Sequence, residues 1–131
     1  MPATTYTANL IAKAIANGSA YQGPATIYLA LVTDTPSATV AGTEVTDDSY
    51  ARVSVDITAW TDDDAGTLSN NVAITWPAAD ADFSADVEAV EAYTASTGGT
   101  RLWYQLLSAP ITFVLGDEPQ FAIGELTMPV V

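Results

Sequence analysis

The stretch Ala25-Thr26-Ile27-Tyr28-Leu29-Ala30-Leu31-Val32 decides the fold class. Apart from Thr26 all of its residues are apolar, so both faces of a strand built from this stretch would avoid water. A strand covered on both sides lies inside a sheet, and the rest of the chain must supply its neighbours and its covering layers. We therefore expect a central strand of a mainly β domain.

Short strands separated by turns are predicted after this stretch. Residues 50–57 alternate, with Val53 and Val55 expected inward and Arg52 outward. Further strands are predicted at 70–76, 87–95, 102–107, 111–115 and 120–128. Thr97-Gly98-Gly99 predicts a hairpin between 87–95 and 102–107, and Gly116-Asp117-Glu118-Pro119 predicts a second one between 111–115 and 120–128. About seven to eight short strands favour an antiparallel β-sandwich over any α/β layout.

A helical period is found at the start of the chain. The residues that share its apolar face are Tyr6, Leu10, Ile11, Ala14 and Ile15. Thr4 or Thr5 can cap this helix, and Asn17-Gly18 supplies residues that tolerate the left-handed conformation at its end. We expect one domain over 1–131, with a short N-terminal helix in 1–18 and a β-sandwich in 19–131.

The apolar face of this helix has two possible placements. On its own sandwich, Leu10, Ile11 and Ile15 would each contribute roughly 1.5–3 kcal/mol by burial. On a neighbouring subunit, the same three side chains would be interface residues. The short link from Gly18 to Pro24 favours the first placement, because it cannot carry the helix far from the first strand.

Composition excludes several classes of function. The chain has 3 Lys and Arg against 16 Asp and Glu, a net charge of −13, and neither His nor Cys. It therefore cannot build a Ser-His-Asp triad, a thiolate nucleophile, a disulfide or a Cys/His zinc site. Three cations cannot neutralise a row of phosphates, so we expect neither nucleic acid nor an anionic membrane as a partner. We expect no enzymatic activity and no cofactor.

The acidic segment that begins at Asp80 is the best candidate for a metal site. If Asp80 is the first position of a calcium loop, the later ligand positions fall on Asp82, Ser84, Asp86, Glu88 and Glu91. However, the sixth position is Ala85, where the sharp turn of such a loop needs glycine, and the flanks are predicted as strand and loop. A solvated acidic loop with non-specific Mg²⁺ or Ca²⁺ binding is the simpler interpretation.

Carbohydrate binding or cleavage is the remaining alternative function that the residues allow. Two carboxylates can hydrolyse a glycosidic bond, but sixteen acids make chance pairs common, so none can be selected. Trp60 or Trp103 at the rim of a cleft beside two carboxylates would indicate a carbohydrate-binding or glycan-cleaving receptor module. Core packing is the simpler role for these aromatic side chains.

A set of short motifs resembles a family of small tailed-phage proteins, the tail fibre or minor tail proteins. These motifs occur in the family's order and with similar gaps over nearly the whole chain: Leu10 to Ala20, Pro24 to Thr33, Gly42-Thr43-Glu44-Val45, Tyr50-Ala51-Arg52, Ser69-Asn70-Asn71, Trp76-Pro77-Ala78-Ala79, Thr97-Gly98-Gly99 and Gly116-Asp117. The chain departs from the family at Glu91-Ala92-Tyr93-Thr94, where a Gly-aliphatic-aromatic-Asp strand is usual.

The resemblance implies a non-enzymatic structural subunit of a virion, assembled in the host cytoplasm with other virion proteins. Tail or tail fibre is the leading position, and a decoration (cement) protein of the capsid head is the alternative. We expect a homo-oligomer, a trimer or hexamer, joined by apolar and backbone contacts, because three cations cannot balance sixteen acids across a symmetric interface. Arg52 is a further interface candidate, since an outward arginine could pair with Glu44 or Asp56 within the chain or across a subunit boundary.

Overall fold

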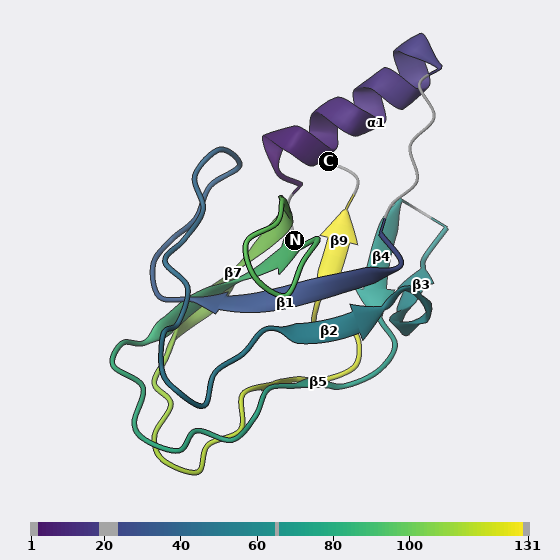
Figure 1. The fold of residues 1–131 in the computed structure, drawn as a ribbon. Coiled ribbons are helices and arrows are strands. Elements are labelled where there is room, and N and C mark those ends of the chain that lie inside the picture. Colours follow the sequence, from purple (N-terminus) through teal and green to yellow (C-terminus); the bar gives the residue numbers. More distant parts are fainter. Residues whose placement is uncertain (1–2, 19–23, 65, 130–131) are drawn as a thin grey trace.

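A computed structural model describes residues 3–18, 24–64 and 66–129. Within these ranges it has one α-helix, one short 3-10 helix and nine strands (Figure 1). The elements are α1 (Thr5–Asn17), β1 (Thr26–Val32), β2 (Val53–Asp56), the 3-10 turn Ile57–Ala59, β3 (Trp60–Asp62), β4 (Thr67–Asn70), β5 (Ile74–Thr75), β6 (Val87–Tyr93), β7 (Arg101–Ile111), β8 (Gln120–Phe121) and β9 (Thr127–Pro129).

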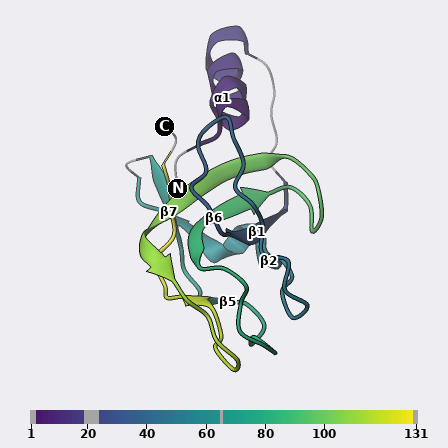
Figure 2. The ribbon, with the colours of Figure 1, turned by 90° about the vertical axis from the view of Figure 1, so that its left-hand side faces the viewer.

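The strands form three antiparallel sheets. The largest has the order β2-β1-β6-β7, and the smaller ones have the orders β3-β4-β9 and β5-β8. The smaller sheets lie on one side of the large sheet in a sandwich-like arrangement (Figures 1 and 2). The predicted mainly β, antiparallel fold class is therefore confirmed.

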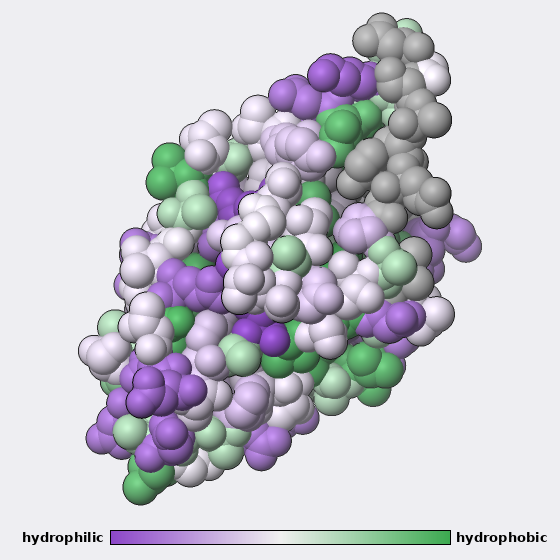
Figure 3. Space-filling model, in the orientation of Figure 1, coloured by the Kyte–Doolittle hydropathy of each residue, from purple (hydrophilic) through white to green (hydrophobic). Residues whose placement is uncertain are grey.

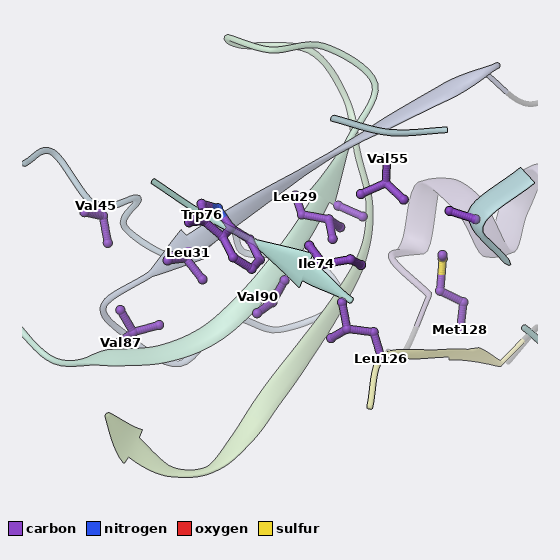
Figure 4. Packing of buried hydrophobic residues seen from close by; sticks show 12 residues of the cluster. Leu29, Leu31, Val45, Val55, Ile74, Trp76, Val87, Val90, Leu126 and Met128 are labelled. Atoms are coloured by element: carbon purple, nitrogen blue, oxygen red, sulfur yellow. The ribbon is translucent and has the colours of Figure 1, made fainter. Parts of the chain in front are cut away.

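One hydrophobic core joins the three sheets. The large sheet contributes Leu29, Leu31, Val55, Val87 and Val90 from one side. The other side of the core is supplied by Ile74, Trp76, Leu126 and Met128 (Figure 4). Trp76 is fully buried, and its ring meets Phe121 edge-on at 5.7 Å between ring centres. Each sheet thus buries its apolar face in the shared core.

The central strand has the environment that its sequence predicts. β1 lies between β2 and β6, and Leu29, Ala30, Leu31 and Val32 are all buried, so both of its faces are covered. The hairpin at Thr97-Gly98-Gly99 is also confirmed, because β6 pairs with β7 from Tyr93 opposite Arg101 onward.

The second predicted hairpin is wrong. β8 pairs with β5, with Ile74 opposite Phe121, and β9 pairs with β4, so neither pairs with 111–115. The predicted strand 70–76 is divided between β4 and β5. Residues after Ile111 hydrogen-bond to the segment 79–83 instead, through Phe83 N–H to Phe113 O and Gly116 N–H to Ala79 O. These backbone hydrogen bonds of Phe113 and Gly116 are therefore made with a segment 30 to 37 residues earlier, and a local turn pattern does not reveal such a distant partner.

The helix begins and ends where its sequence predicts. The Thr4 side chain accepts a hydrogen bond from Thr7 N–H, and Gly18 adopts the left-handed conformation with φ of 64° while its N–H reaches Lys13 O. Both ends are therefore capped. Among the described helices none has the length and apolar character needed to cross a membrane.

Candidate functional site

The outer face of the large sheet is covered by the loop of residues 33–45, the covering loop. Its backbone joins β1 at Val32, which bridges Glu44. Gly42 lies so close to Val32 that a Cβ atom at this position would approach the Val32 Cβ to 2.8 Å. Glycine is therefore required for the loop to lie flat on the strand. This loop explains how Ala30 and Val32, which face away from the main core, become buried.

A buried ion pair fastens the covering loop to the sheet. Glu91 of β6 has no exposed surface, and its Oε2 accepts hydrogen bonds from Arg101 Nη1 at 2.8 Å and from Gly42 N–H at 3.1 Å. Arg101, at the start of β7, also donates to Ser37 O at 2.5 Å. Tyr93 donates to Glu91 Oε1 at 3.1 Å. The two strands and the loop are thus held by one fully hydrogen-bonded carboxylate.

A second arginine joins the same loop to the β6–β7 hairpin. Arg52 binds both carboxylate oxygens of Glu44, the closest approach being 2.9 Å from Nη2. Its Nη1 donates to the backbone oxygens of Ala95 and Gly98, both at 2.8 Å. The guanidinium carbon lies 3.8 Å from the centre of the Tyr93 ring. A forked, planar cation is needed for this combination of contacts.

Tyr50 closes the network on the side of β2. Its hydroxyl donates to Glu44 Oε2 at 2.6 Å and accepts a hydrogen bond from Leu31 N–H at 3.0 Å. That N–H lies beyond the last β1–β2 pair, Leu29 with Val53, so the tyrosine takes the place of a missing strand partner. We call Glu44, Tyr50, Arg52, Glu91, Tyr93 and Arg101 the two-arginine network.

The contacts within the network shift the pKa values of Glu44, Tyr50 and Tyr93. Burial alone would raise the pKa of Glu44, but the Arg52 guanidinium and the Tyr50 hydroxyl outweigh it and lower the pKa below its usual value. Burial and the neighbouring Glu44 raise the pKa of Tyr50 strongly. Burial and Glu91 raise the pKa of Tyr93 to about 12.

Of the pairings left open for Arg52, the structure contains the one with Glu44 within the chain. The role of Glu91 was missed, because an acid in a largely apolar strand does not reveal a cationic partner ten residues later. The one available signal was its position: Val87-Glu88-Ala89-Val90-Glu91-Ala92 places Glu91 where the strand is expected to be buried. A buried carboxylate requires a cation, and the chain has only three.

The structure does not bring the calcium candidates together. Asp80 is exposed, Asp82 Oδ1 accepts from Leu115 N–H at 2.9 Å, and Asp86 Oδ1 accepts from the Thr112 hydroxyl at 2.7 Å. Glu91 is occupied by Arg101 on the large sheet. In the described parts of the chain, no three His, Cys, Asp or Glu residues are grouped so that they could hold a metal ion.

The base of α1 is fixed to its own β7. Ala3 bridges Trp103, and Thr4 N–H donates to Leu102 O at 2.9 Å. The hydroxyls of Thr4 and Thr7, both buried, donate to Arg101 O and Leu102 O at 2.9 and 2.8 Å. The expected docking of the helix on its own sandwich is thus found, but polar contacts of its first turn carry it.

The tip of α1 projects beyond the sheets (Figures 1 and 2). Leu10 and Ile11 are half-buried, whereas Ile15 is 81% exposed, so the expectation that Ile15 is buried against its own sandwich is wrong. Thr7 and Ala14 are seven residues apart and point in nearly the same direction on a helix of 3.6 residues per turn. Thr7 is buried and Ala14 is exposed, because the body ends beneath the helix.

An apolar groove lies near the other end of β7. Val87 pairs with Ile111 and Ala89 with Leu106, so two steps along β6 match five along β7, and residues 107–110 bulge away from the sheet. The space beneath the bulge is a groove of about 630 Å³. Its lining includes Leu106, Leu107, Pro110, Ile111, Phe113 and Phe121, with Glu125 beside them.

The tryptophans that could have formed a sugar platform pack against the core. Trp60 and Trp103 are both half-buried and contact the main hydrophobic cluster. Trp103 also lines a small hollow with Ile11 and Met128 under the helix. Core packing is therefore the role that the structure gives these side chains.

Comparison with known proteins agrees with the resemblance of the motifs. Residues 2–129 match the model of the family described as Podophage GP4 fiber I protein gp80. No individual curated protein matches the chain.

Proposed function

The chain belongs to the phage fibre family described as Podophage GP4 fiber I protein gp80 and is a virion component, and on this premise we propose that it is a non-enzymatic structural subunit of a tail fibre. In this role it assembles with other virion proteins and with further copies of itself, as a trimer or hexamer. The predicted resemblance to phage tail fibre proteins is confirmed by the family match.

The observation that supports a structural role is that both arginines of this chain make contacts that hold segments of the fold together. Arg52 and Arg101 each hold a loop or hairpin in place through an acid, backbone carbonyls and an aromatic ring. The long covering loop is thereby fixed by charged contacts in addition to its short backbone bridge between Val32 and Glu44. A subunit whose surface must keep one shape in a repeated assembly needs this rigidity.

Labelled particles test the proposed position. A phage that carries an epitope-tagged copy of this protein should show label on tail-associated fibres when purified virions are imaged. Label distributed over the head would instead identify the protein as a capsid decoration protein, and absence of label from the purified particles would contradict a structural role.

A further inference from the structure

We propose that the tip of α1 docks into the β7 groove of a second copy, so that subunits join head to tail. This inference deepens the proposed function and rests on its statement that copies assemble with each other. The helix tip consists of Leu10, Ile11, Ala14 and Ile15. The β7 groove is the apolar groove beneath the bulge of β7, lined by Leu106, Leu107, Pro110, Ile111, Phe113 and Phe121.

The helix tip is incomplete within one copy. Its apolar face is covered only in part by its own sheets, because Leu10 and Ile11 are half-buried whereas Ala14 and Ile15 are exposed. A helix of this length is marginal without packing along its apolar face. The face therefore needs a partner surface that is apolar, concave and outside its own base.

The β7 groove has the matching shape. Its lining includes Leu106 and Ile111, which are 49% and 43% exposed although both lie on a strand of the main sheet. The bulge residues Ser108, Ala109 and Pro110 also line the groove, and Pro110 lacks the N–H that would pair with a further strand. A helix laid in a groove is a common way to cover such a surface.

Charge selects a second copy as the occupant. The helix Thr5–Asn17 contains Lys13 and no acid, so it carries +1, while the rest of the chain carries −14. Among the described residues, Lys13 is the cation that makes no ion pair in its own chain. The groove is bordered by Glu125 and, across the bulge, by Glu88.

The loops next to the groove add further negative charge. Asp80, Asp82, Asp86, Asp117 and Glu118 lie in them, and no Lys or Arg follows Arg101 in the sequence. This end of the molecule, lower left in Figure 3, is largely hydrophilic around a few apolar residues. A partner segment that carries acidic residues would be repelled there. α1 contains no acid and would not be repelled.

The two surfaces lie at opposite ends of one molecule. α1 is attached where β7 starts, at Leu102, and the groove begins three residues further on, at Gln105, and extends to the strand's end. A contact between different patches of identical subunits is heterologous, and it generates a ring when the rotation closes. Closed rings of three or six copies are the expected product.

Mixing of two defective variants tests this contact. We expect Ile15→Glu, in the helix tip, and Leu106→Glu, in the groove, each to raise the concentration at which half of the protein is monomeric by about tenfold or more, because each places a charge in an apolar contact. Sedimentation of the two variants mixed in equal amounts should then give a one-to-one dimer, because the intact helix of one fits the intact groove of the other.

Two matched variants control for charge and for folding. Ala16→Glu adds the same charge one residue later, on the face that points about 180° away from Thr7. Val72→Glu replaces an apolar side chain of similar exposure, 45%, outside the groove. Both should assemble as the wild type does, and all four variants should keep its far-ultraviolet circular dichroism.

Three results would overturn the inference. These are assembly of Ile15→Glu at the wild-type concentration, failure of the mixed variants to form a dimer, and a wild-type protein that stays monomeric at high concentration. A monomeric protein that is nevertheless found in the fibres of labelled particles would overturn this contact and leave the proposed function standing.

Discussion

The two ends of the molecule use charge in opposite ways. At the helix end, Arg52 and Arg101 are each paired with a glutamate and bound to backbone carbonyls. At the end formed by the loops 78–86 and 112–119, which we call the acidic end, carboxylates accept hydrogen bonds from nearby N–H and hydroxyl groups without a cation. Ion pairs are thus placed where a long loop must be fixed, and acids are left unpaired where the surface faces water.

The largest expected effect comes from breaking the buried pair at the helix end. Glu91→Gln leaves Arg101 buried without a counter-charge, and we expect a loss of about 3–5 kcal/mol in the free energy of unfolding. Urea denaturation measures this loss. Glu88→Gln is the matched control, because it makes the same change on the same strand where the carboxylate accepts a single exposed hydrogen bond from Thr35. A loss of similar size in both variants would contradict the special role of Glu91.

The attachment of the helix is the next largest contribution. Thr4→Ala removes the cap of α1 and the hydrogen bond to Arg101 O, and we expect a loss of about 1–2 kcal/mol. Far-ultraviolet circular dichroism should show that the helix melts before the sheets. Thr5→Ala, one residue later with an exposed side chain, should change stability little.

The pair at the surface should contribute less and depend on pH. Glu44→Gln is expected to cost about 1 kcal/mol at neutral pH, because Glu44 is partly exposed and solvent screens its ion pair. Since the pKa of Glu44 is lowered in the folded state, its contribution is complete above the ordinary value of 4.5 and is lost as the pH falls through the lowered value. Wild type and variant should therefore become equally stable in acid. A difference that persists below pH 4 and into strong acid would contradict the lowered pKa.

The acidic end should respond to salt more than to substitution. Asp82→Asn is expected to change stability by less than about 0.5 kcal/mol, because the neighbouring amide can still be satisfied. The melting temperature of the wild type should rise between dilute buffer and molar salt, or with millimolar Mg²⁺, because a net charge of −13 repels itself until it is screened. A melting temperature independent of ionic strength would show that the acids are already well separated.

The sequence predicted those parts of the fold that depend on residues close together in the chain. β1, the helix caps and the Thr97-Gly98-Gly99 hairpin depend on residues close in sequence, and each lies where it was expected. The strand pairs β5–β8 and β4–β9 join residues that are 45 to 62 positions apart, and turn residues at Gly116 favoured the wrong partner. Non-local pairing is set by the whole core and leaves little trace in one segment.

The candidate site was predicted in part for a similar reason. The Arg52–Glu44 pair follows from an outward arginine with an acid nearby, eight residues earlier. The Glu91–Arg101 pair depends on the covering loop that buries it, and the β7 groove depends on a bulge whose cause is the mismatch between two strands. The sequence around Glu91 indicates that the acid is buried but not which cation it pairs with, and the sequence of β7 does not indicate the groove.

The most direct test of the head-to-tail account is cross-linking between the two ends. The chain has no cysteine, so Ile15→Cys and Leu106→Cys combined in one chain place two thiols at the helix tip and in the groove. With a short bis-maleimide, we predict covalent multimers that end at a trimer or hexamer from the double variant, and monomers from each single variant. Dimers from Ile15→Cys alone, or no intermolecular product from the double variant, would contradict the account.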